Sequence, residues 1–196
     1  MYFCYWGREG YTRQFRFHSL ARVAAEIEWA AKHKISYMFN ADSNFGMHKR
    51  DLEIANMLVQ AKQEYGYPEK FRTCWGKNTD EQIYRIARLL HEHGLDKGMT
   101  LGRQSNSKEV LTNIKRDNIS LEAFSSMQER FNANNVPIYA ELILGLPGET
   151  RTSWVNGIED LLLTGLNNQL FVYPSEIYPN TEQGDSIYRK KFGIKT

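Results

Sequence analysis

The stretch that decides the fold runs from Val136 to Thr150 and reads VPIYAELILGLPGET. Residues 136–146 predict the strongest strand of the sequence, because apolar and branched residues dominate them. The strand ends in a Gly-Leu-Pro-Gly-Glu turn, in which Gly145 lets a planar group or a backbone approach closely. Thr150 can cap a following helix whose amide end can meet a negative group. A plain strand-to-helix turn is the alternative interpretation.

Helical and extended patterns alternate outward from this stretch. Predicted strands start near residues 35, 71, 98, 136 and 169, and each gap between them contains at least one helical pattern. Serine or threonine can cap these helices at Ser19, Thr79, Ser107, Ser120 and Thr150. Crossover helices between successive strands force a parallel sheet. The sequence therefore predicts an α/β fold, a partial (β/α) barrel with parallel strands.

Composition is that of an ordinary globular protein. Of 196 residues, 41% are apolar and 24% are charged, and the net charge of +2 implies no general polyanion-binding surface. The sequence has no run of 18 apolar residues and no signal-peptide zones at its start, so no membrane span is predicted. Two cysteines, Cys4 and Cys74, cannot form a disulfide framework, and a reduced, cytoplasmic setting fits best. No linker divides residues 1–196, which are predicted to form one domain.

Polar residues cluster just after the predicted strands. In a parallel α/β barrel, the working face lies at the carboxyl ends of the strands. The residues found there are Asp42 and Asn44, Lys77 and Asn78, Gln104 and Ser105, Gly145 to Glu149, and Glu176. They predict a site for a polar, charged ligand. The alternative is that loops are polar wherever strands end.

Cysteine and histidine give no metal site by spacing alone. Cys4 beside aromatic residues is open to a packing or a metal-binding interpretation, and Cys74 is expected to fill the core of its strand. The five histidines show no ligand spacing beyond His91 and His93, which point to different faces of one helix and are expected to be solvated.

Together these features resemble the radical S-adenosylmethionine (SAM) superfamily, and within it the enzymes that also carry a cobalamin-binding domain. Such enzymes hold a [4Fe-4S] cluster on a Cys-x-x-x-Cys-x-aromatic-Cys loop after the first barrel strand. Phe3-Cys4 matches the aromatic residue and the third cysteine, Met1 stands at the second, and the first would precede the chain. The resemblance implies a barrel of radical SAM type, with Cys4 as a metal ligand, truncated within this loop and at the C-terminus.

The resemblance also implies roles in binding SAM. Asp42 and Asn44 fall where the family binds the methionine amino group, and the segment with Gln104, Ser105 and Arg116 resembles its stretch near the ribose and carboxylate. The strand and turn with Ile143, Gly145 and Leu146 resemble the adenine side. Purely structural roles remain as alternatives for three of these residues. Asp42 can cap a turn, Ser105 can cap a helix, and Arg116 can pair with Asp117 or another carboxylate.

The function implied is reductive cleavage of SAM to a 5′-deoxyadenosyl radical, with cobalamin-dependent methyl transfer in the full-length protein through a domain absent here. The residues identify no catalytic side chain, and the fragment alone is expected to be inactive. An electron donor such as a flavodoxin or ferredoxin is expected, with a small-molecule or peptide substrate that the sequence does not identify. No membrane or nucleic-acid partner is expected, although a basic early segment leaves a tRNA-modifying relative open: Arg8, Arg13, Arg16 and Arg22. The rival function is a non-catalytic barrel that binds or scaffolds without the cluster.

Overall fold

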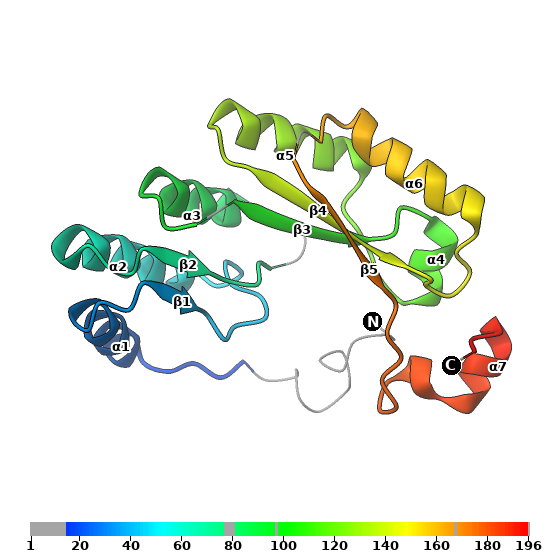
Figure 1. The fold of residues 1–196 in the computed structure, drawn as a ribbon, viewed down its shortest axis with the longest axis horizontal. Helices are drawn as coiled ribbons and strands as arrows, with labels where there is room; N and C mark the ends of the chain where they lie inside the picture. The colour runs from blue at the N-terminus through cyan, green and yellow to red at the C-terminus, as the bar shows by residue number, and fades with distance from the viewer. Residues whose placement is uncertain (1–14, 77–80, 97, 167, 196) are drawn as a thin grey trace. The chain divides into compact units, whose positions relative to one another are not determined.

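The computed structural model describes residues 15–76, 81–96, 98–166 and 168–195. Helices and strands alternate along these residues (Figure 1). In chain order they are α1 (Leu20–Lys32), β1 (Tyr37–Phe39), α2 (Arg50–Tyr65), β2 (Lys70–Arg72), α3 (Glu81–Glu92), β3 (Met99–Gln104), α4 (Lys108–Asn113), α5 (Leu121–Ala133), β4 (Ile138–Leu144), α6 (Arg151–Leu163), β5 (Leu170–Pro174), the short 3-10 helix η2 (Glu182–Gly184) and α7 (Ser186–Phe192).

The strands confirm an α/β fold with parallel pairing. β1 runs parallel to β2, with Tyr37 opposite Lys70, and β4 runs parallel to β5, with Ala140 opposite Leu170. Each of the five predicted strands is present, although β1 and β2 are only three residues long. Helices connect the parallel strands, as crossover connections require.

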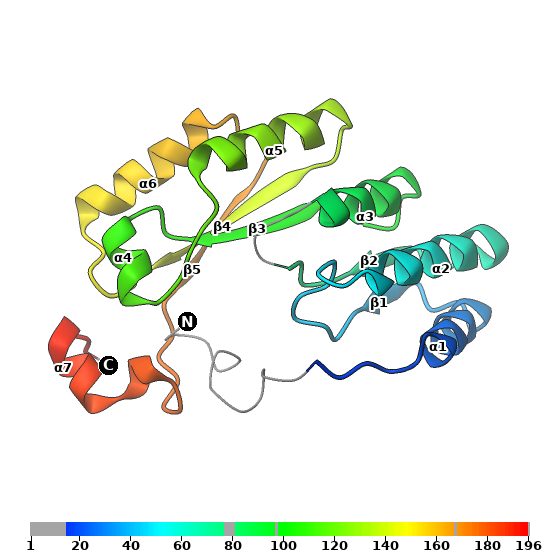
Figure 2. The same cartoon turned by 180° about the vertical axis from the view of Figure 1, so that it is seen from behind.

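The described strands form two sheets, neither of which closes on itself. One contains β1 and β2, and the other has the order β3-β4-β5, with β4 in the centre (Figure 2). Beside β2, the N–H of Phe71 donates to the carbonyl of Leu95 in the connection before β3, at 2.6 Å. Met99, at the start of β3, donates instead to the carbonyl of Pro137, at 2.8 Å. Two open sheets of parallel strands agree with the predicted partial barrel.

Packing divides the chain into two compact units. Among the described residues, unit 1 contains residues 15–16, 102–125, 140–166 and 168–195, and unit 2 contains residues 17–76, 81–96, 98–101 and 126–139. The division crosses β3, α5 and β4.

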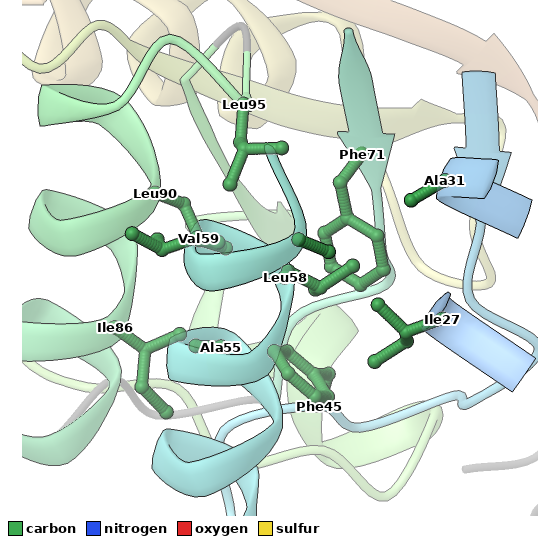
Figure 3. Packing of buried hydrophobic residues seen from close by; sticks show 11 residues of the cluster. Ile27, Ala31, Phe45, Ala55, Leu58, Val59, Phe71, Ile86, Leu90 and Leu95 are labelled. Atoms are coloured by element: carbon green, nitrogen blue, oxygen red, sulfur yellow. The ribbon is translucent and has the colours of Figure 1, made fainter. Parts of the chain in front are cut away.

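Unit 2 is packed around an apolar core. α2 lies between α1 and α3, and its buried residues meet those of both neighbours and of β2 (Figure 3). The helical spacing of three and four residues brings one face of each helix to this core. The buried members are Ile27, Ala31, Phe45, Ala55, Leu58, Val59, Ala61, Phe71, Ile86, Leu90 and Leu95.

Unit 1 has a small apolar cluster and several buried polar side chains. Val110 and Ile114 of the α4 region pack against Leu146, which follows β4. The polar and charged side chains buried in this unit are Arg103, Ser105, Arg116, Thr181 and Gln183. Hydrogen bonds of Arg103, Ser105 and Arg116 help to fix β3 and the loop that follows it, and Ser105 joins this loop to Glu149 after β4.

Four predicted helix caps are confirmed. In each, a side-chain hydroxyl accepts the backbone N–H three residues further on, which satisfies an otherwise unpaired helix donor. The caps are Ser19, Ser107, Ser120 and Thr150. Thr79 lies outside the described residues. Gln82, three residues further on, donates its side-chain amide to the carbonyls of Gly46 and His48.

The prediction that Cys74 fills the core of its strand is wrong. Cys74 is exposed, whereas Phe71 is buried and both Thr73 and Trp75 are half-buried. Side chains alternate between the two faces of extended chain, so the odd-numbered positions here face the core and Cys74 faces away with Arg72. The residue type suggested burial, but the parity of the position decides it.

His91 and His93 are half-buried instead of solvated. Nδ1 of His91 lies 3.3 Å from Oδ1 of the buried Asp96, and Nδ1 of His93 lies 2.9 Å from the carbonyl oxygen of Leu89.

Among the residues that the structure describes, no helix is both long and apolar enough to span a membrane.

Candidate functional site

Gln104 ends β3 in a strained conformation. Its φ is +67°, in the left-handed region that residues with a side chain seldom adopt. The other described non-glycine residues with positive φ all follow the end of a helix, where this conformation is common: Lys34, Lys115 and Asn135. Strain of this kind at a strand end is typical of ligand-binding sites.

The Gln104 side chain folds back over β3. A Cβ built on Gly102 would lie 2.7 Å from Nε2 of Gln104 and 3.5 Å from Oε2 of Glu141, so both side-chain ends lie close to this glycine. Gly102, Gln104 and Glu141 are half-buried, whereas their chain neighbours Leu101, Arg103, Ala140 and Leu142 are buried. One face of β3 and β4 therefore carries an amide and a carboxylate side by side.

Glu141 is a candidate residue that the sequence analysis missed. It stands in the middle of the apolar strand β4, and its register partner on β5 is Phe171. A carboxylate at such a position is costly unless it has a polar role or partner. That interruption of an apolar run was the signal available in the sequence.

Arg116 lies buried beside β3. Its Nη2 donates to the carbonyl of Gly102, and its Nε donates to Oδ1 of Asn118 at 2.8 Å. Burial lowers the pKa of Arg116 to about 10; the charge of Arg103 acts in the same direction, and Glu141 opposes it. Arg116 therefore stays charged at neutral pH and fixes the backbone of β3 at the site.

Ser105 joins the loops that follow β3 and β4. Its Oγ donates to Oε2 of Glu149 at 2.7 Å and accepts the N–H of Ser107 at 3.1 Å. The other oxygen of Glu149 accepts a hydrogen bond from the Ser153 hydroxyl at the start of α6. The single hydroxyl proton of Ser105 is thus directed at Glu149, and the serine holds the two loops together.

The turn after β4 leaves open space at the strand end. Gly145 has φ +88° and is exposed, and a Cβ built on it would have its nearest neighbour, Cβ of Ser175, at 4.0 Å. Leu146 is buried against α4, and the half-buried Ile143 packs on the same cluster. A planar ligand can approach the backbone here, with apolar side chains beneath it.

Asp42 and Asn44 lie in unit 2, in the loop after β1. Oδ1 of Asp42 accepts the N–H of Asn44 at 2.9 Å, and the amide of Asn44 donates to the Ser43 hydroxyl at 2.8 Å. Asp42 therefore closes the turn that follows it, as the turn-capping alternative expects. The predicted site residues in unit 1 are Gln104, Ser105, Arg116, Ile143, Gly145 and Leu146.

Several predicted site residues lie outside the described part of the chain: Cys4, Lys77 and Asn78. Within the described residues, no group of three or more His, Cys, Asp or Glu side chains is arranged to hold a metal ion. The donor set for an iron–sulfur cluster is therefore not found in this part, and Cys4 as a ligand stays a prediction.

Two characterised proteins are similar to nearly the whole chain, although no family model matches it. The chain is 38% identical over 194 residues to the cobalamin-dependent radical SAM methyltransferase TokK of Streptomyces tokunonensis. It is 37% identical over 194 residues to a 2-(S-pantetheinyl)-carbapenam-3-carboxylate methyltransferase of Streptantibioticus cattleyicolor. Each match covers 99% of the chain but only 28% of the relative's length.

A solved structure is similar in fold. The radical SAM methyltransferase TsrM of Kitasatospora setae, with cobalamin and a [4Fe-4S] cluster bound, matches with a TM-score of 0.65 and 18% sequence identity. The match covers 91% of this chain and 35% of that one. The resemblance to cobalamin-dependent radical SAM enzymes is thereby confirmed, and the fold is a partial barrel of the radical SAM type.

Proposed function

We propose that this chain forms the SAM-holding part of a cobalamin-dependent radical SAM methyltransferase. The observation that carries the proposal is 37–38% identity over 99% of the chain to two methyltransferases. The strained Gln104 and the open turn at Gly145, both at carboxyl ends of strands in unit 1, support it.

Within unit 1, different residues take different tasks. The amide of Gln104 and the carboxylate of Glu141 provide polar atoms for the hydroxyls of an adenosyl group. The backbone around Gly145, with Ile143 and Leu146 as an apolar support, suits the flat adenine ring. Ser105 and Arg116 support the site without contacting the ligand, because Ser105 holds Glu149 in place and Arg116 holds β3.

The amino group of SAM requires an acceptor, and Asp42 with Asn44 stays the proposed source. Cys4 stays the proposed cluster ligand, with the remaining cysteines and the cobalamin domain contributed by other parts of the whole protein. When bound, the cluster would supply the electron for reductive cleavage of SAM, and cobalamin would carry the methyl group. We propose a flavodoxin or ferredoxin as the electron donor.

The test uses the whole protein, reconstituted anaerobically with iron, sulfide and cobalamin. We expect SAM-dependent formation of 5′-deoxyadenosine and transfer of an isotope-labelled methyl group to an acceptor. The acceptor named for the second relative, a carbapenam carboxylate with an S-pantetheinyl group, is the first to assay. A whole protein that binds no cluster and does not consume SAM would instead support the non-catalytic barrel.

Site variants sharpen this test. Glu141→Gln removes a negative charge from the proposed adenosyl side, and we expect KM for SAM to rise about tenfold because charge-assisted hydrogen bonds are lost. Glu159→Gln makes the same change at an exposed position of α6 and should leave KM unchanged. Equal KM values for both variants would remove Glu141 from the site.

A further inference from the structure

The segment after β5 folds back toward the turn that ends β4. We call residues 175–192, which contain η2 and α7, the hook (Figure 1). It starts at the site itself, because the N–H of Ser175 donates to the carbonyl of Leu144 at 2.8 Å. The hook and the turn both belong to unit 1.

The hook is built as a defined structure. The hydroxyl of the buried Thr181 donates to the carbonyl of Tyr178 at 2.7 Å, and the amide of the buried Gln183 donates to the Ser175 hydroxyl at 3.3 Å. The carboxylate of Asp185 caps α7 by accepting two of its first N–H groups. These contacts fix the direction of α7 within the hook.

Tyr188 of α7 reaches the end of α4. Its hydroxyl donates to the carbonyl of Asn113 at 2.9 Å, across 75 residues of sequence. Burial, and secondarily the charge of Glu182, raises the pKa of Tyr188 to about 12, so the hydroxyl stays a donor at physiological pH. The carbonyls of the three residues before Asn113 accept backbone N–H groups; these residues are Val110, Leu111 and Thr112. The hydroxyl of Tyr188 supplies the donor for the carbonyl of Asn113 itself.

Asn113 also contacts the turn of residues 145–148. Its side-chain amide donates to the carbonyl of Pro147 at 3.0 Å. A Cβ built on Gly148 would lie only 2.5 Å from the same amide nitrogen, so the two residues are packed as closely as a glycine allows. Asn113 therefore contacts the hook through its main chain and the turn through its side chain.

We propose that Tyr188 is a positioning residue, which acts through Asn113 to hold the turn of residues 145–148 in its ligand-binding conformation. The turn contains two left-handed glycines, Gly145 and Gly148, which are free to adopt other conformations when unsupported. If the turn is correctly formed for only a fraction of the time, the apparent affinity for a ligand falls by that fraction. The inference rests on the proposed function, in which the adenosyl group lies at this turn.

The experiment measures SAM kinetics and amide hydrogen exchange in the whole protein carrying Tyr188→Phe. We expect KM for SAM to rise about fivefold, because one buried hydrogen bond is lost, with kcat nearly unchanged. Exchange should accelerate in residues 145–150 and not across unit 2. Tyr178→Phe is the matched control, since it removes a tyrosine hydroxyl of the same hook that donates to the nearby Glu176.

Asn113 provides a second variant. Asn113→Ala and Asn113→Asp both remove the donor to Pro147, and both should raise KM at least as much as Tyr188→Phe does. Unchanged KM and exchange in all three variants would overturn the proposal, as would a lowered melting temperature without either change. If the wild-type protein binds no SAM, the proposed function fails, and the exchange of residues 145–150 still decides whether Tyr188 holds the turn.

Discussion

The helices of unit 2 and the candidate-site loops of unit 1 are held in place by different kinds of contact. In unit 2, α1, α2 and α3 bury a continuous apolar core that includes Leu58 and Phe71 (Figure 3). In unit 1, the loops of the candidate site are fixed by buried polar side chains, among them Ser105 and Arg116, with a small apolar cluster at Leu146.

The difference separates a supporting region from a binding region. Apolar packing depends on volume and is non-directional, so it stabilises without specifying where a polar group points. Hydrogen bonds between Ser105, Glu149 and Ser153 are directional, and they set the position of two loops at once. Substitutions in unit 2 should therefore act through lost volume, and substitutions in unit 1 through polar groups left without partners.

The largest expected effect is that of Leu58→Ala in the apolar core of unit 2. Leu58 is fully buried, and its truncation should lower the free energy of unfolding by about 3 kcal/mol through lost transfer energy and a residual cavity. Equilibrium denaturation with urea measures the loss. Leu163→Ala, at a position 79% exposed, should cost less than about 0.5 kcal/mol. Equal losses would mean that the core does not dominate this unit.

Glu149→Ala tests the polar frame of unit 1. Two serine hydroxyls lose their carboxylate acceptor, and we expect a loss of about 2 kcal/mol in the free energy of unfolding. Glu159→Ala removes an exposed carboxylate from the same region and should cost less than about 0.5 kcal/mol. A Glu149→Ala protein as stable as this control would show that the frame does not depend on the carboxylate.

Two glycines with nearly equal φ allow a finer measurement. Gly148 has φ +86° and Gly165 has φ +85°, so alanine at either position carries a similar backbone strain of about 1 kcal/mol. Of these two glycines, only Gly148 would bring the new Cβ against other groups, the amide nitrogen of Asn113 at 2.5 Å and Oε1 of Glu109 at 3.3 Å. Gly148→Ala should therefore cost about 1 kcal/mol more than Gly165→Ala in urea denaturation. Equal costs would indicate that Asn113 does not press on the turn.

Local patterns in the sequence were sufficient to predict the alternation of the fold. Ile83, Ile86, Ala87 and Leu90 recur at helical spacing, and these four residues are buried in α3. The hydroxyl of Thr150 caps α6 as expected. Such features depend on residues within a turn or two of one another, and a single sequence contains that information.

Contacts between distant residues could not be predicted in this way. Ser105 and Glu149 are 44 residues apart, and nothing in the spacing of either residue indicates the other. The division into two sheets is likewise a long-range feature, since the N–H of Phe71 bonds to Leu95 in the connection before β3 and not to β3 itself. Glu141 was detectable as a carboxylate within an apolar strand, but its place beside Gln104 depends on the pairing of two strands.

Asp96 tests the comparison where unit 2 departs from apolar packing, and its expected effect is the smallest. Its Oδ2 is buried with no hydrogen-bond partner in the described structure, while Oδ1 lies 3.3 Å from His91 and the ammonium of Lys70 lies 3.5 Å from its carbonyl oxygen. Burial raises the pKa of Asp96 above its ordinary value of 3.8, and His91 partly opposes the shift.

A raised pKa means that the folded protein favours the protonated carboxyl. The stability that Asp96 contributes is then complete below pH 3.8 and is lost as the pH rises through the raised value. Asp96→Asn cannot ionise, so its unfolding free energy relative to wild type should increase as the pH rises through this window. Glu26→Gln should give the opposite slope, because a hydrogen bond from Arg22 lowers the pKa of Glu26. Parallel curves for Asp96→Asn and wild type would mean that His91 and Lys70 fully compensate the buried charge, and that polar pairing matters in unit 2 as it does in unit 1.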